Sequence, residues 1–199
     1  MSKRVAVLVS GGGTNLQALI DAQGTTIHSG QIALVISNVD GAYALQRAKN
    51  AGIPTQVVCK KACGSQTAFE DRLLELLSQY QIDVIVLAGF MTILTEHFTG
   101  RYPNRILNVH PSLIPSFCGE GFYGLRVHEA ALAYGVKVTG ATVHFVNEIC
   151  DGGQIIMQKA VPVLPGDTPE SLQRRVMEQA EWILLPQAVE QVCAGLGGK

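Results

Sequence analysis

Short runs of Val, Ile and Leu alternate along the first half of the chain with segments whose apolar residues recur every three to four positions. The runs predict strands and the recurring segments predict helices. Such an alternation is typical of a parallel sheet covered by helices on both faces. The predicted strands are residues 4–9, 32–37, 55–58, 84–88 and 105–109, and the predicted helices are residues 15–22, 42–50, 67–80 and 95–100.

The pattern changes after residue 110. A loop over 111–126 leads to a short helix over 127–134, and two longer runs, 138–146 and 154–163, predict paired strands. Thr168-Pro169-Glu170 then supplies an N-cap, a first-turn proline and a first-turn acid. Apolar residues at helical spacing follow, namely Leu172, Val176, Ala180, Ile183 and Leu184. We therefore predict an α/β fold with a doubly wound, mostly parallel (mixed) sheet, helices on both faces and a closing helix packed back on the sheet.

The composition fits one domain, residues 1–199. The chain is 47% hydrophobic, enough for one core, and its formal net charge of -1 argues against a nucleic-acid surface. Its apolar runs are strand-sized and fall short of the roughly 20 residues that a membrane helix needs. Five scattered cysteines, with no leader before the first strand, predict a reduced, cytoplasmic protein. We expect small-molecule ligands and neither nucleic acid nor membrane as partner.

A glycine-rich turn, Ser-Gly-Gly-Gly-Thr-Asn over residues 10–15, follows the first predicted strand. Missing β-carbons let the backbone approach a ligand, and the next helix offers unpaired N–H groups that suit a phosphate. Leu16 stands where a dinucleotide fingerprint has its third glycine, so a single phosphate monoester fits better. The alternative is a tight turn that needs glycine for its geometry alone.

The last parallel strand ends in Asn108 and His110, which are two residues apart and therefore face the same way. With a carboxylate from Asp151, they form a set suited to acyl transfer, in which Asn108 and His110 donate to an oxyanion and Asp151 fixes and charges the imidazole. The alternatives are polar groups that satisfy buried backbone, and an ordinary Asp-Gly turn at Asp151. We interpret His128 and His144 as structural.

The cysteines offer no metal site. Cys59 and Cys63 lack a companion pair of ligands, so zinc is not expected. Cys118 lies in the loop after Pro115 and could act as a thiol nucleophile, although packing explains it better.

Five segments together resemble the glycinamide ribonucleotide transformylases, a family of formyl-folate enzymes of purine synthesis. They are residues 10–15, 88–91, 107–115, 139–145 and 151–153. The resemblance implies transfer of the formyl group of 10-formyltetrahydrofolate to the amine of glycinamide ribonucleotide, without a metal. It implies catalytic roles for Asn108, His110 and Asp151.

The resemblance also implies a division of the binding residues, with the ribonucleotide phosphate in residues 1–100 and the folate and the chemistry in residues 101–199. The substrate-binding residues would be Gly12, Gly13, Thr14, Asn15 and Glu181. Matching Glu181 to the family's pattern requires a one-residue gap. The folate-binding residues would be Met91, Thr92, Ile93, Leu94, Ile106, Val146, Asn147 and Glu148. The sequence leaves the oligomeric state open between a monomer and a homodimer.

The chain departs from the family's pattern at two positions. Gln66 and Thr92 stand where related enzymes often have arginines near the substrate phosphate and the folate tail. Lys60, Lys61 or Arg126 could replace that charge. Two rivals stay open, a formyltetrahydrofolate hydrolase or other formyltransferase, and a nucleotide-sensing module without chemistry.

Overall fold

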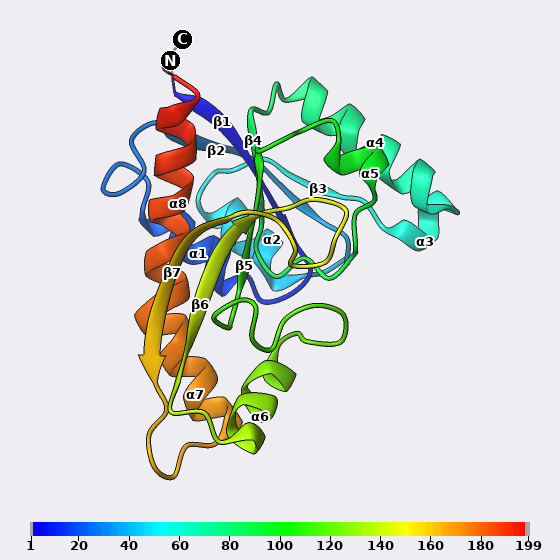
Figure 1. Ribbon diagram of the computed structural model, residues 1–199. Helices are drawn as coiled ribbons and strands as arrows, with labels where there is room; N and C mark the ends of the chain where they lie inside the picture. Colours follow the sequence, from blue (N-terminus) through cyan, green and yellow to red (C-terminus); the bar gives the residue numbers. More distant parts are fainter. Residues whose placement is uncertain (1, 198–199) are drawn as a thin grey trace.

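A seven-stranded sheet with the order β3-β2-β1-β4-β5-β6-β7 forms the centre of the computed structural model, which describes residues 2–197 (Figure 1). The neighbouring pairs among the first five strands are parallel, and β6 and β7 run antiparallel to their neighbours. The predicted mixed, mostly parallel sheet is therefore confirmed. The strands are β1 Lys3–Val9, β2 Gly30–Ser37, β3 Thr55–Val57, β4 Val84–Leu87, β5 Ile106–His110, β6 Val138–Phe145 and β7 Ile155–Pro162.

Alternating side chains of the central strands feed two separate apolar layers. Val5 and Val7 of β1 pack into the layer of helices α1, α2, α7 and α8, whereas Ala6 and Leu8 pack into the layer of α4 and α5. Figure 1 shows α1 and α8 together beside the sheet and α4 with α5 on the other side. The helices are α1 Thr14–Asp21, α2 Tyr43–Asn50, α3 Lys60–Cys63, α4 Gln66–Gln79, α5 Glu96–Thr99, α6 Leu125–Tyr134, α7 Pro169–Val176 and α8 Trp182–Gly195.

The predicted closing helix is interrupted. Thr168 caps α7 as expected, with its side chain accepting from the Ser171 N–H, but a π-helical turn, η1 Met177–Glu181, separates α7 from α8. A π turn rotates the residues after it relative to a regular α-helical face. Ile183, predicted on the buried face, is 38% exposed, whereas the other four predicted residues, Leu172, Val176, Ala180 and Leu184, are buried. The sequence prediction also missed α3, whose four residues are too few to show a period.

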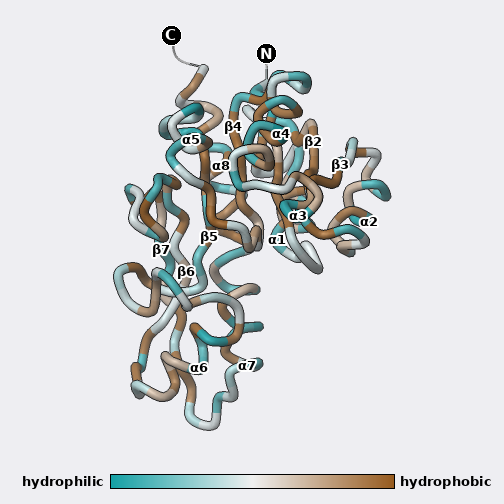
Figure 2. Tube along the Cα trace, turned by 90° about the vertical axis from the view of Figure 1, so that its right-hand side faces the viewer, coloured by the Kyte–Doolittle hydropathy of each residue, from teal (hydrophilic) through white to brown (hydrophobic). Residues whose placement is uncertain are grey.

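The strand order reverses between β1 and β4, because the chain returns to the other side of β1 after β3. In open α/β sheets ligands bind outside the carboxyl ends of the strands at such a point. The glycine-rich turn after β1 and the segment after β4 both lie at this edge. Figure 2 shows hydrophobic residues concentrated along central strands such as β4, with polar residues in the helices and loops around them. Within residues 2–197, we find no helix with the length and apolar character of a membrane span.

Candidate active site

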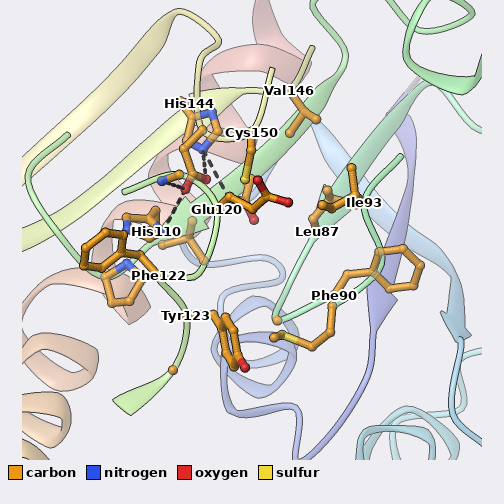
Figure 3. A pocket seen from close by; sticks show the side chains of 18 of the residues that line it. Leu87, Phe90, Ile93, His110, Glu120, Phe122, Tyr123, His144, Val146 and Cys150 are labelled. Carbon is orange, nitrogen blue, oxygen red and sulfur yellow. Dashed lines mark hydrogen bonds and ion pairs between the residues drawn. The ribbon is translucent and has the colours of Figure 1, made fainter. Parts of the chain in front are cut away.

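A cavity of about 660 Å³ opens at the carboxyl edge of β1, β4 and β5. Its wall brings together residues from the glycine-rich turn, from β5, from the loop after β6 and from η1. Figure 3 shows His110 and His144 on one side of this cavity and Leu87, Ile93 and Val146 on the other. The lining includes twelve of the predicted site residues, namely Asn15, Met91, Thr92, Ile93, Leu94, Asn108, His110, Val146, Asn147, Glu148, Asp151 and Glu181.

Asp151 lies between two imidazoles. Its Oδ2 is 3.5 Å from His110 Nδ1, and its Oδ1 is 3.5 Å from His144 Nε2. Asn108 Nδ2 is 3.2 Å from the same His144 nitrogen. The structure thus places the three predicted catalytic side chains around one point at the end of β5, where an oxyanion would find donors and a nearby carboxylate.

A backbone carbonyl, rather than Asp151, fixes the His110 ring. His110 Nε2 is 2.8 Å from Phe117 O, and because a carbonyl only accepts, this nitrogen carries the proton. The Phe117 ring packs edge-on against Phe122 and Tyr134, which holds the carbonyl in place. The sequence interpretation gave this orienting role to Asp151, whose contact with Nδ1 is longer than a hydrogen bond. His110 Nδ1 is therefore the nitrogen left for chemistry.

The Asp151 carboxylate is held by the loop that follows β5. The Gly119 N–H donates to its Oδ2 at 2.8 Å, and the side chain is only 9% exposed. Burial raises the pKa of Asp151, but the adjacent imidazole of His144, the Gly119 N–H and the nearby His110 outweigh burial, so its pKa lies below the usual value. Asp151 is an anion at neutral pH.

His144 lines the cavity beside the three predicted catalytic side chains, a placement that the sequence interpretation did not include. Asn108 and His144 are partners in the antiparallel ladder between β5 and β6. Directly opposed residues lie within side-chain reach, so a site that contains Asn108 has His144 beside it. The alternation within β6 alone could not show this, because the strand pairing was unknown.

Glu181 reaches the cavity from η1 and meets the glycine-rich turn there. Its Oε2 accepts from Asn15 Nδ2 at 2.8 Å. The side chain is buried, and burial raises the pKa of Glu181 to about 6 in spite of the Asn15 hydrogen bond. Asn15 Oδ1 is also buried and has no partner among the described residues, which leaves an acceptor for a ligand.

Replacing Glu181 with glutamine should stabilise the protein at pH 8 and not at pH 4. A folded pKa of about 6, above the usual 4.5, means that folding favours the protonated acid, so this contribution to stability is lost as the pH rises. Glutamine keeps an acceptor for Asn15 and has no charge. We expect the free energy of unfolding to increase by about 2 kcal/mol at pH 8, measured by urea denaturation. An equal increase at both pH values would contradict this explanation.

The glycines of the turn after β1 differ in what the fold requires of them. Gly13 has φ +73°, and a β-carbon there would lie 2.6 Å from Ala44 Cβ, so packing alone demands glycine. A β-carbon at Gly12 would meet nothing within 4 Å. A turn that needs glycine for its geometry alone therefore explains Gly13. It does not explain Gly12, where a ligand could approach the backbone closely. The cavity wall includes Asn15 but not Gly12, Gly13 or Thr14.

A cation that the sequence interpretation missed lies at this turn. Arg47 of α2 donates through Nε to Gly12 O at 2.8 Å and through a terminal nitrogen to Gln17 Oε1 at 3.1 Å. Its guanidinium also lies over the Tyr43 ring. Lys60 and Lys61, two of the suggested replacements, are exposed on α3. Only the packing of Arg47 against the turn, which the sequence does not show, could have identified it.

The apolar side of the cavity is made by the segments after β4 and β6. Met91 and Ile93 are 55% and 61% exposed at its mouth, which is unusual for side chains of this size. Ile106 is different, because it is fully buried in the layer of α4 and α5 and does not line the cavity. Ile106 precedes Asn108 by two residues on β5, so the two side chains point to the same face of the sheet. Ile106 lies beneath the site.

The two positions that lack arginine make polar contacts within the protein. Gln66 donates to Ile93 O at 3.1 Å, and Asn38 donates to Thr92 Oγ1 at 2.7 Å. Arg126, a suggested replacement, lies over the Tyr123 ring. The loop from Gly119 to Gly124 adds Glu120, Phe122 and Tyr123 to the cavity wall, and their roles were not predicted.

Comparisons with known proteins agree with this fold. Residues 3–189 match the model of the formyl transferase family. The chain is 43% identical to the phosphoribosylglycinamide formyltransferase of Haemophilus influenzae over 97% of its length and 88% of that protein. The crystal structure of glycinamide ribonucleotide transformylase 1 from Symbiobacterium toebii superposes with a TM-score of 0.91 at 44% identity, over 98% of this chain and 89% of that one.

A similar segment occurs within longer proteins. The chain is 47% identical over 192 residues to the human trifunctional purine biosynthetic protein adenosine-3, of which it spans only 18%. The chain belongs to the formyl transferase family. Within that family, the relatives that it matches over most of both lengths are phosphoribosylglycinamide formyltransferases, enzymes of purine biosynthesis.

Proposed function

We propose that this chain transfers the formyl group of 10-formyltetrahydrofolate to the amine of glycinamide ribonucleotide, giving N-formylglycinamide ribonucleotide and tetrahydrofolate. The convergence of Asn108, His110 and Asp151 carries the proposal, since Asp151 lies 3.5 Å from His110 and Asn108 adjoins the imidazole that Asp151 also contacts. These groups stand between a glycine-rich turn and an apolar wall, which suit a phosphate and a folate.

The proposed reaction follows from what each side chain can do. The neutral amine attacks the formyl carbon, and its oxygen becomes an oxyanion that accepts hydrogen bonds from Asn108 Nδ2 and from protonated His110 Nδ1. Asp151 stabilises that imidazolium and assists, through water, the transfer of the amine proton to N10. The C–N10 bond then breaks as the carbonyl forms again, and tetrahydrofolate leaves.

The binding roles are proposals of the same kind. The backbone N–H groups of Gly12, Gly13, Thr14 and Asn15 would hold the phosphate at the start of α1. The unpartnered Asn15 Oδ1 and the Glu181 carboxylate would accept from the substrate's hydroxyl or amine groups. The folate would lie along Met91, Ile93, Leu94 and Val146, with Thr92, Asn147 and Glu148 beside it. We retain a cytoplasmic location as a proposal, since all five cysteines are free thiols.

The experiment that tests the function follows the folate product. Purified protein is incubated with 10-formyltetrahydrofolate, with and without glycinamide ribonucleotide. Turnover that depends on the amine supports the transferase. Turnover without the amine would indicate a hydrolase, and ligand binding without turnover would indicate a sensing module.

Arg47 should contribute to ribonucleotide affinity. If the phosphate lies at the glycine-rich turn, the guanidinium that contacts Gly12 lies next to it. Replacing Arg47 with glutamine should raise KM for the ribonucleotide about tenfold, because a hydrogen bond to a charged group contributes roughly 1.5–3 kcal/mol. The matched control is Lys49→Gln, an exposed cation on the same helix, which should leave KM unchanged. An unchanged KM in Arg47→Gln would place the phosphate elsewhere.

A further inference from the structure

His144 contacts three polar groups in the site, but the proposed reaction assigns it no role. It is 2% exposed, and three groups surround its ring. Nδ1 lies 2.7 Å from Phe145 O, while Nε2 lies 3.2 Å from Asn108 Nδ2 and 3.5 Å from Asp151 Oδ1. These contacts determine where the ring carries its proton.

The Phe145 contact places a proton on Nδ1. A carbonyl oxygen can only accept, so at 2.7 Å His144 Nδ1 must donate. In a neutral imidazole the other nitrogen, Nε2, then carries a lone pair and accepts. The group within hydrogen-bond distance of that lone pair is the Asn108 amide nitrogen, a donor.

This arrangement also determines which end of the Asn108 carboxamide faces the reacting groups. Asn108 Nδ2 and Asp151 Oδ1 both lie within 3.5 Å of one imidazole nitrogen, so the amide nitrogen is on the carboxylate's side. The reversed amide would bring its oxygen to that place, next to a lone pair and an anion. A neutral His144 excludes this orientation because three acceptors would then meet without a donor.

We propose that His144 is a positioning residue, which as a neutral imidazole protonated on Nδ1 turns the NH2 group of Asn108 toward the formyl oxygen. The inference rests on the proposed function, and it deepens that function by assigning the orientation of an oxyanion donor. One N–H of Asn108 is bound by His144 Nε2, and the second is free to donate in the cavity that Asn108 lines. His144 acts through Asn108 and does not touch the substrate.

Two substitutions distinguish the hydrogen bond that His144 makes with Phe145 O from the one that it makes with Asn108. His144→Gln places an amide oxygen near the position of Nε2, where it can still accept from Asn108. His144→Asn is too short to reach Asn108 but keeps an N–H near the Phe145 carbonyl. We expect kcat to fall about tenfold or more in His144→Asn, with KM for both substrates within about twofold, and to recover most of that loss in His144→Gln.

The background of Asn108→Ala distinguishes positioning from a structural role. In the Asn108→Ala protein, adding His144→Asn should lower kcat by no more than about twofold further, because the side chain that His144 holds is already absent. A full tenfold loss in that background would overturn the proposal, since His144 would then act through Asp151 or through packing. Equal activity of His144→Gln and His144→Asn would overturn it as well.

A measurement on the free wild-type protein keeps the proposal testable if a variant fails to fold. The ¹⁵N shifts of the His144 ring, in protein labelled at histidine, report which nitrogen is protonated. We expect a neutral ring protonated on Nδ1 at pH 7.5, and a charged ring or one protonated on Nε2 would overturn the proposal. This readout needs no turnover. An enzyme that transfers formyl groups with the wrong tautomer refutes the role of His144 alone, whereas absence of amine-dependent turnover refutes the proposed function.

Discussion

Replacing His110 with alanine should lower kcat by at least about a hundredfold, the usual contribution of a positioned acid or base. The ring is anchored by Phe117 O through Nε2, so the variant loses the Nδ1 donor that faces Asp151 and the oxyanion. The measurement is the steady-state rate of tetrahydrofolate formation at saturating substrates.

Two further variants make the His110 result specific. His110→Gln keeps a side-chain N–H that can donate to Phe117 O but has no titratable Nδ1, so its kcat should be as low as that of the alanine variant. His97→Ala removes an exposed imidazole that pairs only with Asp71 at the surface, and its kcat should equal that of the wild type. Wild-type kcat in His110→Gln would remove Nδ1 from the reaction.

Asp151→Asn should also lower kcat by at least about a hundredfold, because the imidazolium of His110 loses its counter-charge while the side chain keeps its shape. Asparagine can still accept from the Gly119 N–H through its oxygen, so the loop should remain in place. The variant should also change the response to acid. The folded protein holds the pKa of Asp151 low, so its carboxylate contributes stability above the unfolded pKa that is lost as the pH falls.

Asp167 supplies the matched control. It is paired with Arg175 through two contacts of 2.6 Å, and its pKa is held well below the usual range by that arginine. Asp167→Asn should lower thermal stability and leave kcat unchanged, whereas Asp151→Asn should lower kcat. If both variants lost activity in parallel with stability, the effect at Asp151 would be structural.

The local sequence predicts the elements but not their pairing. Short apolar runs located β1, β4 and β5 within a residue or two, because the strands of a sheet covered on both faces are apolar throughout. The role of His144 depends on its position opposite Asn108 in the pairing of β5 with β6. This register is a property of two strands together and cannot be seen in the sequence of either one. Arg47 was missed for the same reason, since its contact with Gly12 joins α2 to the glycine-rich turn before α1.

The predicted site shows the same limit. Asn108 and His110 share a face by the period of the strand. The structure brings Asp151 to them from about forty residues away, which the chemistry of the three side chains and the resemblance indicated and spacing alone could not. Ile106 obeys the same period, yet it lies beneath the site because burial depends on what covers the strand. Beyond η1 the predicted pattern holds for Leu184, which is buried, and fails for Ile183, which is 38% exposed.

The claim that His110 and Asp151 act as one acid–base unit is tested most directly by a double-mutant cycle. The kcat values of His110→Ala, Asp151→Asn and the double variant are compared with that of the wild type under saturating substrates. Residues that act as one unit are strongly non-additive, so the double variant should be within a few-fold of the slower single variant. A loss equal to the product of the two single losses, on the order of ten-thousandfold, would show that the two side chains work independently and would contradict this account.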